Sequence, residues 1–135
     1  MSQENVEVVR RNLEAWHRDD FDSWLTGFDT TVEWHTVLER AVEGPDSCYR
    51  GHEGLHRLWR DYRTEQGFQI GAVELRDVGD DRVVLLGRIS VRGLTSGIES
   101  ESPIGMVITV RDERVIHSVD FLSHNEALKA VGLEE

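Results

Sequence analysis

Three consecutive segments near the C-terminus alternate apolar and polar residues with a period of two. They cover residues 82–92, 101–111 and 114–123. This period is that of β-strands, whose successive side chains point to opposite faces of a sheet. The Gly- and Ser-rich stretch 93–100 and the tight turn 111–114 connect the segments. Short connections join antiparallel neighbours, so the sequence predicts a three-stranded antiparallel meander.

Neither face of this meander is wholly polar. Strict alternation places Val119 and Phe121 on one face of the sheet. It places Arg88, Ser118 and Asp120 together on the other face. Because apolar residues occur on both faces, we expect both to be partly covered, one by the body of the protein and one by a partner.

Length and charge exclude several classes of protein. The 135 residues suffice for a buried core, and we expect 1–135 to form a single domain. The net charge of −11 is spread along the chain, which argues against nucleic acid or an anionic membrane as partner. No apolar run reaches the length of a membrane span. The lone Cys48 cannot form an internal disulfide, so we expect a cytoplasmic protein.

The segments around the meander predict helices and two further strands. Apolar residues at helical spacing predict one helix through Val6 and Trp16 and a shorter one through Phe21 and Phe28. The stretch 37–50 contains a Gly-Pro-Asp turn signal and is expected to be a long irregular flap. Further elements are expected at 31–36 (strand), 52–66 (helix), 68–78 (strand) and 125–132 (short helix). This order is typical of an α+β fold with helices on one side of a curved sheet.

Three stretches carry a family resemblance that spans nearly the whole chain. The segments VVRRNLEAWHRDDFDSWLTGFDTTVEWH, YRGHEGL and ITVRDERVIHSVDFLSHNEALKAVGL resemble the nuclear transport factor 2-like superfamily, and in particular its SnoaL-like members. The resemblance implies a cone-shaped, cystatin-like roll. Its curved, mostly antiparallel sheet would pack on three N-terminal helices, with a short C-terminal helix. It also implies an apolar pocket and a homodimer formed through the outer face of the sheet.

The resemblance extends to ketosteroid isomerases, which use a carboxylate base, a tyrosine and a protonated aspartic acid. Trp34 occupies the position of the base. The aspartic acid position falls on Gly105 or Met106, and the tyrosine position on Asn12 or Leu13. None of the three groups is present, which argues against that isomerase chemistry.

Two other motifs resemble those of limonene-epoxide-hydrolase-like members. The segment GRIS places Arg88 in the arginine position of an Arg-x-Asp motif, but Ser90 replaces its aspartate. The segment SVDFL puts Asp120 where the water-activating carboxylate sits. Two strands apart, Arg88 and Asp120 would have Cα atoms about 10 Å from each other, so we expect the arginine to hold the aspartate ionised as a base. A surface or interface ion pair without catalytic role is the alternative.

The implied pocket would select a small flat or apolar molecule. Large aromatic residues at these positions are also typical of core packing, which is how we interpret Trp24. His35 is a candidate base or hydrogen-bonding group at the pocket mouth, with an exposed strand histidine as the alternative. The residues expected to contact the ligand are Trp16, Trp34, Trp59, Tyr62, Ser90, Met106 and Ser118.

His52 and His56 belong to an H-E-x-x-H motif, a pattern that binds zinc in metalloproteases. Here the motif directly follows Gly51 at the expected start of a helix, whereas a zinc protease carries it in mid-helix. We therefore expect neither a metal nor another cofactor.

Two functions follow as hypotheses. The first is an acid/base enzyme of the cyclase, isomerase or hydrolase type that acts on an apolar or polyketide-like molecule. Its catalytic residues would be Asp120, Arg88 and His35, and a polyketide-cyclase-like role needs the fewest groups. The second is a non-catalytic ligand-binding or interaction domain on the same fold.

Overall fold

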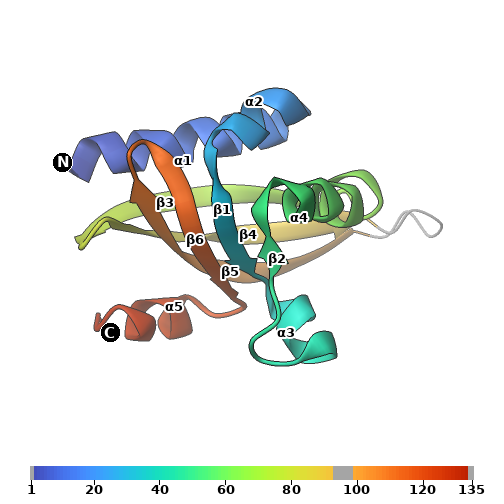
Figure 1. Ribbon diagram of the computed structural model, residues 1–135. Coiled ribbons are helices and arrows are strands. Elements are labelled where there is room, and N and C mark those ends of the chain that lie inside the picture. The colour runs from blue at the N-terminus through green and yellow to red at the C-terminus, as the bar shows by residue number, and fades with distance from the viewer. Residues whose placement is uncertain (1, 93–98, 134–135) are drawn as a thin grey trace.

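The computed structural model describes residues 2–92 and 99–133 and shows an α+β fold built on one curved sheet (Figure 1). The sheet has six strands in the order β2-β1-β6-β5-β4-β3. The pair β1–β6 is parallel and the other pairs are antiparallel. The strands are β1 (Phe28–His35), β2 (Tyr49–Arg50), β3 (Gln69–Gly79), β4 (Arg82–Arg92), β5 (Glu99–Arg111) and β6 (Arg114–Phe121).

Helices cover both faces of the sheet (Figure 1). Aromatic and aliphatic side chains from α1, α2 and α4 form the main core with the concave face, while α5 packs on the opposite face. The helices are α1 (Ser2–His17), α2 (Phe21–Thr26), α3 (Val37–Glu43), α4 (Gly51–Leu58), its π-helical continuation η1 (Trp59–Thr64) and α5 (His124–Ala130). None of the helices in residues 2–92 and 99–133 is both long and apolar enough to cross a membrane. The expected α+β class, curved sheet and short C-terminal helix are confirmed. The expectation that the helices share one side of the sheet is wrong for α5, which packs on the face opposite to α1, α2 and α4.

The expected irregular flap at 37–50 is wrong, because the segment contains α3 and the short strand β2. Thr36 caps α3 by accepting a hydrogen bond from the Glu39 backbone N–H at 3.1 Å. A threonine followed three residues later by a glutamate is the capping-box signature of a helix start. The Gly-Pro-Asp signal does mark the turn between α3 and β2.

A β-bulge in β6 changes which residues face the core. Thr109 of β5 pairs with His117, whereas the next residue of β5, Val110, pairs with Val115. Ile116 is therefore an extra residue without a partner on β5. After Ile116, each residue of β6 points to the face opposite to the one that strict alternation along the sequence predicts.

The expected face assignment of β6 is therefore wrong. Val115, Ser118 and Asp120 all face the concave side, where they line a cavity. Phe121 instead packs against the cluster under α5 on the outer side. Bulges bend a strand and re-aim its side chains in this way, often beside functional sites.

The outer face of the sheet is partly covered by the chain itself. Ala127 and Leu128 of α5 pack on Val84 and Val107 of β4 and β5. Gly105 permits this approach, because a Cβ atom there would lie 2.6 Å from Cβ of Ala127. The homodimer expected through this face stays a prediction, and the area open to a partner is smaller than the sequence indicates. The expected connection between β4 and β5 falls largely on residues 93–98, which lie outside the described residues.

Candidate functional site

A cavity of about 410 Å³ lies between the helices and the concave face of the sheet. Its walls come from α1, α2, α3, α4, η1 and strands β1, β3, β4, β5 and β6, and are almost entirely apolar. Three of the lining residues are exposed, Ala41 and Leu38 (58%) on α3 and Leu122 (51%), which directly follows β6. They mark the mouth of the cavity, beside α3. A cavity of this size and character fits a small, mostly apolar molecule.

Asp120 is a buried carboxyl in this apolar wall, with only 9% of its surface exposed. The parallel pairing of β1 and β6 sets Trp34 opposite Ser118, so the indole reaches the carboxyl two residues further along β6. Nε1 of Trp34 donates a hydrogen bond of 2.9 Å to Oδ1 of Asp120. Within the described lining, Asp120 is the only residue whose side chain can carry a full charge near neutral pH.

Burial raises the pKa of Asp120 to about 7, while the Trp34 hydrogen bond and the charge of Arg40 act in the opposite direction. Removing a carboxylate from water destabilises its charged form, and only partial compensation is present here. Near neutral pH the group therefore exchanges its proton readily. A carboxyl with such a pKa can act as a general base or a general acid.

Arg40 of α3 fixes the backbone beside the site. Its Nη2 donates to the carbonyl oxygen of Asp120 at 2.6 Å, and its Nη1 donates to the carbonyl oxygen of His35 at 2.9 Å. The guanidinium also lies over the ring of Phe121, 5.6 Å from its centre. It thereby joins α3 to the ends of β1 and β6. Sequence reasoning did not single out Arg40, although its position one helical turn after Thr36 was readable.

Uncharged polar side chains also lie in the cavity wall, namely those of Asn12, Thr36, Tyr62, Ser102 and Ser118. The hydroxyl of Tyr62 and Oγ1 of Thr36 share a hydrogen bond of 3.0 Å. Burial raises the pKa of Tyr62 despite that bond, and the Asp120 charge raises it further, so Tyr62 remains a neutral donor. Oγ of Ser118 is buried without a hydrogen-bond partner among the described residues. A ligand oxygen or nitrogen would satisfy it.

The expected pairing of Arg88 with Asp120 is wrong. Arg88 points to the outer face, where its Nε donates to Oε1 of Glu101 at 3.0 Å and 50% of its side chain is exposed. Ser90 also lies outside the cavity lining. The bulge in β6 explains the lost pairing, because it turns Asp120 to the face opposite to that of Arg88 and Ser90, which follow the regular alternation of β4.

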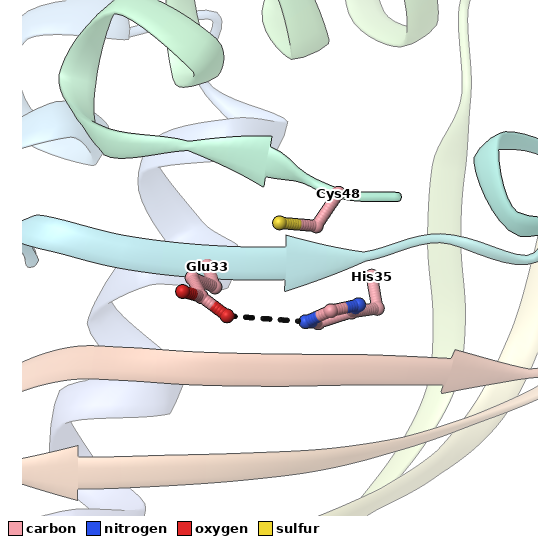
Figure 2. Close-up of side chains that lie close together, drawn as sticks. All are labelled: Glu33, His35 and Cys48. Carbon is pink, nitrogen blue, oxygen red and sulfur yellow. Dashed lines mark ion pairs between the residues drawn. The ribbon is translucent and has the colours of Figure 1, made fainter. Parts of the chain in front are cut away.

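His35 is also placed away from the cavity. Trp34 points inward, so the adjacent residue on the strand points to the other face. There Nε2 of His35 lies 3.4 Å from Oε1 of Glu33. The dashed line in Figure 2 marks this pair. His35 therefore does not share a site with Asp120, and its expected part in the same chemistry has no support from its position.

Most of the expected ligand contacts do line the cavity. Trp59 is the exception among the aromatic residues, because it packs in the core against Trp16, with ring centroids 5.1 Å apart. Trp24, expected to be core only, is buried and also lines the cavity. The expected residues found in the lining are Trp16, Trp34, Tyr62, Met106 and Ser118. Their roles in binding stay predictions.

The H-E-x-x-H motif forms the first turns of α4, as expected. His52 hydrogen-bonds the carbonyl oxygen of Phe28 at 2.9 Å through Nε2. His56 packs on the ring of Phe21 instead, with ring centroids 4.7 Å apart. The two rings serve the packing of α4.

The curved sheet, the helices on its concave side and the enclosed apolar cavity define a nuclear transport factor 2-like protein. The sequence matches the SnoaL-like domain over residues 9–118, and the chain belongs to this family. A search of curated proteins finds no match to the sequence.

Solved structures with the same fold cover nearly the full chain. A nuclear transport factor 2-like protein of unknown function from Burkholderia pseudomallei is 21% identical, with a TM-score of 0.75 over 96% of this chain and 98% of that one. TerC, co-crystallised with polyporic acid, is also 21% identical, with a TM-score of 0.75 over 95% and 98%. A proposed polyketide cyclase from Xanthomonas campestris is 16% identical, with a TM-score of 0.77 over 97% and 98%. At these identities the likeness shows the fold.

Proposed function

We propose that the protein is an acid/base enzyme in which Asp120 transfers a proton to or from a small, largely apolar molecule. One observation carries the proposal: a carboxyl with a pKa of about 7 lies in the wall of an otherwise apolar cavity of about 410 Å³. A base works best when its pKa is close to the working pH, and an apolar environment strengthens its interaction with a substrate proton.

Neighbouring groups supply the rest of such a reaction. Oδ1 of Asp120 accepts from Trp34, which leaves Oδ2 for the substrate. The neutral hydroxyl of Tyr62 and the unpartnered hydroxyl of Ser118 can donate to a substrate oxygen on which charge develops. The aromatic walls suit a flat ring system, such as the polyketide-like compounds that cyclases of this fold act on.

A second candidate is ligand binding without chemistry. The described lining holds a single carboxyl, and Arg88 and His35 lie elsewhere, so proton transfer depends on Asp120 with help only from uncharged polar side chains. A carrier or sensor would need the apolar cavity alone. The two functions are separated by an assay whose reaction needs a general base but does not need the natural substrate.

The test uses 5-nitrobenzisoxazole, a flat apolar molecule with one acidic C–H bond. A base removes that proton, the N–O bond breaks, and a nitrile and a coloured phenolate form. We expect turnover that rises with pH through about 7 and falls roughly 100-fold or more in Asp120→Asn. Asp112→Asn, in the exposed turn between β5 and β6, is the matched control and should retain full activity.

Binding of the probe is followed separately through the fluorescence of the tryptophans in the cavity wall. If wild-type protein binds the probe yet turns it over no faster than Asp120→Asn, the acid/base proposal is contradicted and the binding function is supported. If the Asp112→Asn control loses activity equally, the signal does not come from the cavity and the proposal also fails.

A further inference from the structure

Three side chains with metal-binding atoms converge on the outer face of the sheet, away from the cavity. They are Glu33 and His35 of β1 and Cys48, which immediately precedes β2 (Figure 2). One ligand atom from each lies within 4.8 Å of the other two. We propose that these residues bind a divalent cation of the zinc class.

Strand geometry brings the three groups together. Glu33 and His35 are two positions apart on one strand and therefore share a face. In the antiparallel pair β1–β2, Trp34 is opposite Tyr49, so the register sets Cys48 across from His35. The same pleat that points Trp34 into the cavity points its two neighbours to the outer face.

The distances suit a tetrahedral ion with little rearrangement. Zinc bonds of 2.0–2.3 Å in a tetrahedral site separate neighbouring ligand atoms by roughly 3.3–3.8 Å. Nε2 of His35 and Oε1 of Glu33 are already 3.4 Å apart. Since all three atoms lie within 4.8 Å of one another, side-chain shifts of about 1 Å close the site.

The donor set also selects the class of ion. A thiolate, an imidazole and a carboxylate together favour zinc and its neighbours over magnesium or calcium, which prefer oxygen ligands alone. Partial burial raises the pKa of Cys48, so the thiol is protonated before the ion binds. Binding then forms the Sγ–metal bond and releases the thiol proton to solvent.

A fourth ligand is within reach. His117 of β6 pairs with Glu33 in the parallel register, and its ring centre is 5.0 Å from that of His35. Burial, and then His35, lower the pKa of His117, which keeps its ring neutral and able to coordinate. Water is the other candidate for this position.

Arg50 competes with the ion for Glu33. Its Nη1 lies 2.5 Å from Oε2 of Glu33, and 67% of its side chain is exposed. An exposed arginine of this kind gains little from the pair and can turn into solvent. Removing its charge should therefore strengthen metal binding, an effect that a purely structural cluster would not show.

A metal ion bound by Glu33, His35 and Cys48 would also affect the cavity, through the helix α3. His35 and Cys48 stand at the two ends of the segment that contains α3. Val37, Leu38 and Ala41 of this helix line the cavity. An ion bound to both ends closes the segment into a loop and holds α3 in place at the cavity mouth.

The experiment titrates the full chain, freed of metal by a chelator and then dialysed, with Co²⁺ and afterwards with Zn²⁺. We expect one Co²⁺ per chain, a near-ultraviolet band from thiolate-to-cobalt charge transfer, and loss of that band when Zn²⁺ displaces Co²⁺. Cys48→Ser should abolish the band, and His35→Gln should weaken binding roughly tenfold or more. Arg50→Gln should bind more tightly than the wild type.

His56→Gln is the matched control, because His56 belongs to the H-E-x-x-H motif and lies outside the cluster. Its affinity should equal that of the wild type. A wild-type protein without the thiolate band, or binding that persists unchanged in Cys48→Ser and His35→Gln, overturns the proposal. Circular dichroism of the metal-free variants checks their folding, and Glu33→Gln replaces His35→Gln if that variant does not fold.

Discussion

Nε1 of Trp34 donates a hydrogen bond of 2.9 Å to Oδ1 of Asp120, and so joins β1 to β6 across the wall of an apolar cavity. The bond favours the ionised carboxylate, while burial favours the protonated form. The balance of these two effects brings the pKa of Asp120 to about 7. The proposed function depends on that balance.

Replacing Trp34 by phenylalanine should raise the pKa of Asp120. The substitution keeps an aromatic ring in the wall but removes the donor that stabilises the charged carboxylate. The pH midpoint of the 5-nitrobenzisoxazole reaction should therefore move to higher pH. Trp24→Phe changes a neighbouring ring that does not bond Asp120, and it should leave the midpoint in place. Equal midpoints in Trp34→Phe and the wild type would contradict the role of the indole.

Asp120→Asn should become more stable relative to the wild type as the pH rises. The folded-state pKa of about 7 exceeds the ordinary value of 3.8. The stability that Asp120 contributes to the wild type is therefore fully present below about pH 4 and is lost as the pH rises through 7. At about 1.36 kcal/mol per pKa unit, the difference approaches ~4 kcal/mol above pH 7. Urea unfolding of both proteins at pH 4.5, 6 and 8 measures this difference in the free energy of unfolding, because these pH values span the range over which the folded Asp120 should lose its proton. A pH-independent difference would mean that Asp120 is ionised over the whole range.

Arg40→Met should destabilise the fold and loosen α3. The change removes donors to the carbonyl oxygens of His35 and Asp120, and hydrogen bonds to charged groups contribute about 1.5–3 kcal/mol. It also removes a positive charge that lowers the pKa of Asp120. Urea unfolding measures the loss in stability. Amide hydrogen exchange shows where the structure loosens, and we expect faster exchange in α3 only. Arg18→Met, at an exposed pair with Asp20, should change neither.

Gly105→Ala should lower the free energy of unfolding by about 1–3 kcal/mol, the usual cost of overpacking. The added Cβ would stand 2.6 Å from Cβ of Ala127, so α5 must shift away from the sheet. Ala127→Gly supplies the missing space at a helix-propensity cost of about 1 kcal/mol. In a double-mutant cycle, we expect the double variant to be more stable than the sum of the two single changes predicts. Strict additivity would mean that the two positions do not touch.

The architecture could be predicted from local patterns, because strand alternation and helical spacing depend on each element alone. The meander and the amphipathic helices follow directly from that. The helix α3 was missed although Thr36 and Glu39 form a capping pattern, since the Gly-Pro-Asp signal that follows favoured a loop.

The site was harder to predict, because it depends on contacts between distant strands. The bulge at Ile116 adds one residue to β6 and reverses the face of Asp120. Alternation along the sequence does not reveal a bulge, so the prediction from alternation placed Asp120 on the same face as Arg88. The cluster of Glu33, His35 and Cys48 escaped for the same reason, because its members meet only through the β1–β2 register.

The most direct test is the pKa of the Asp120 carboxyl, measured by carbon-13 NMR titration of the side-chain carboxyls. The Asp120 resonance is assigned as the one absent from the spectrum of Asp120→Asn. We expect it to titrate with a midpoint near pH 7. A midpoint near 4, the range of an ordinary solvated aspartate, would contradict the proposal that Asp120 exchanges protons with a ligand in the cavity.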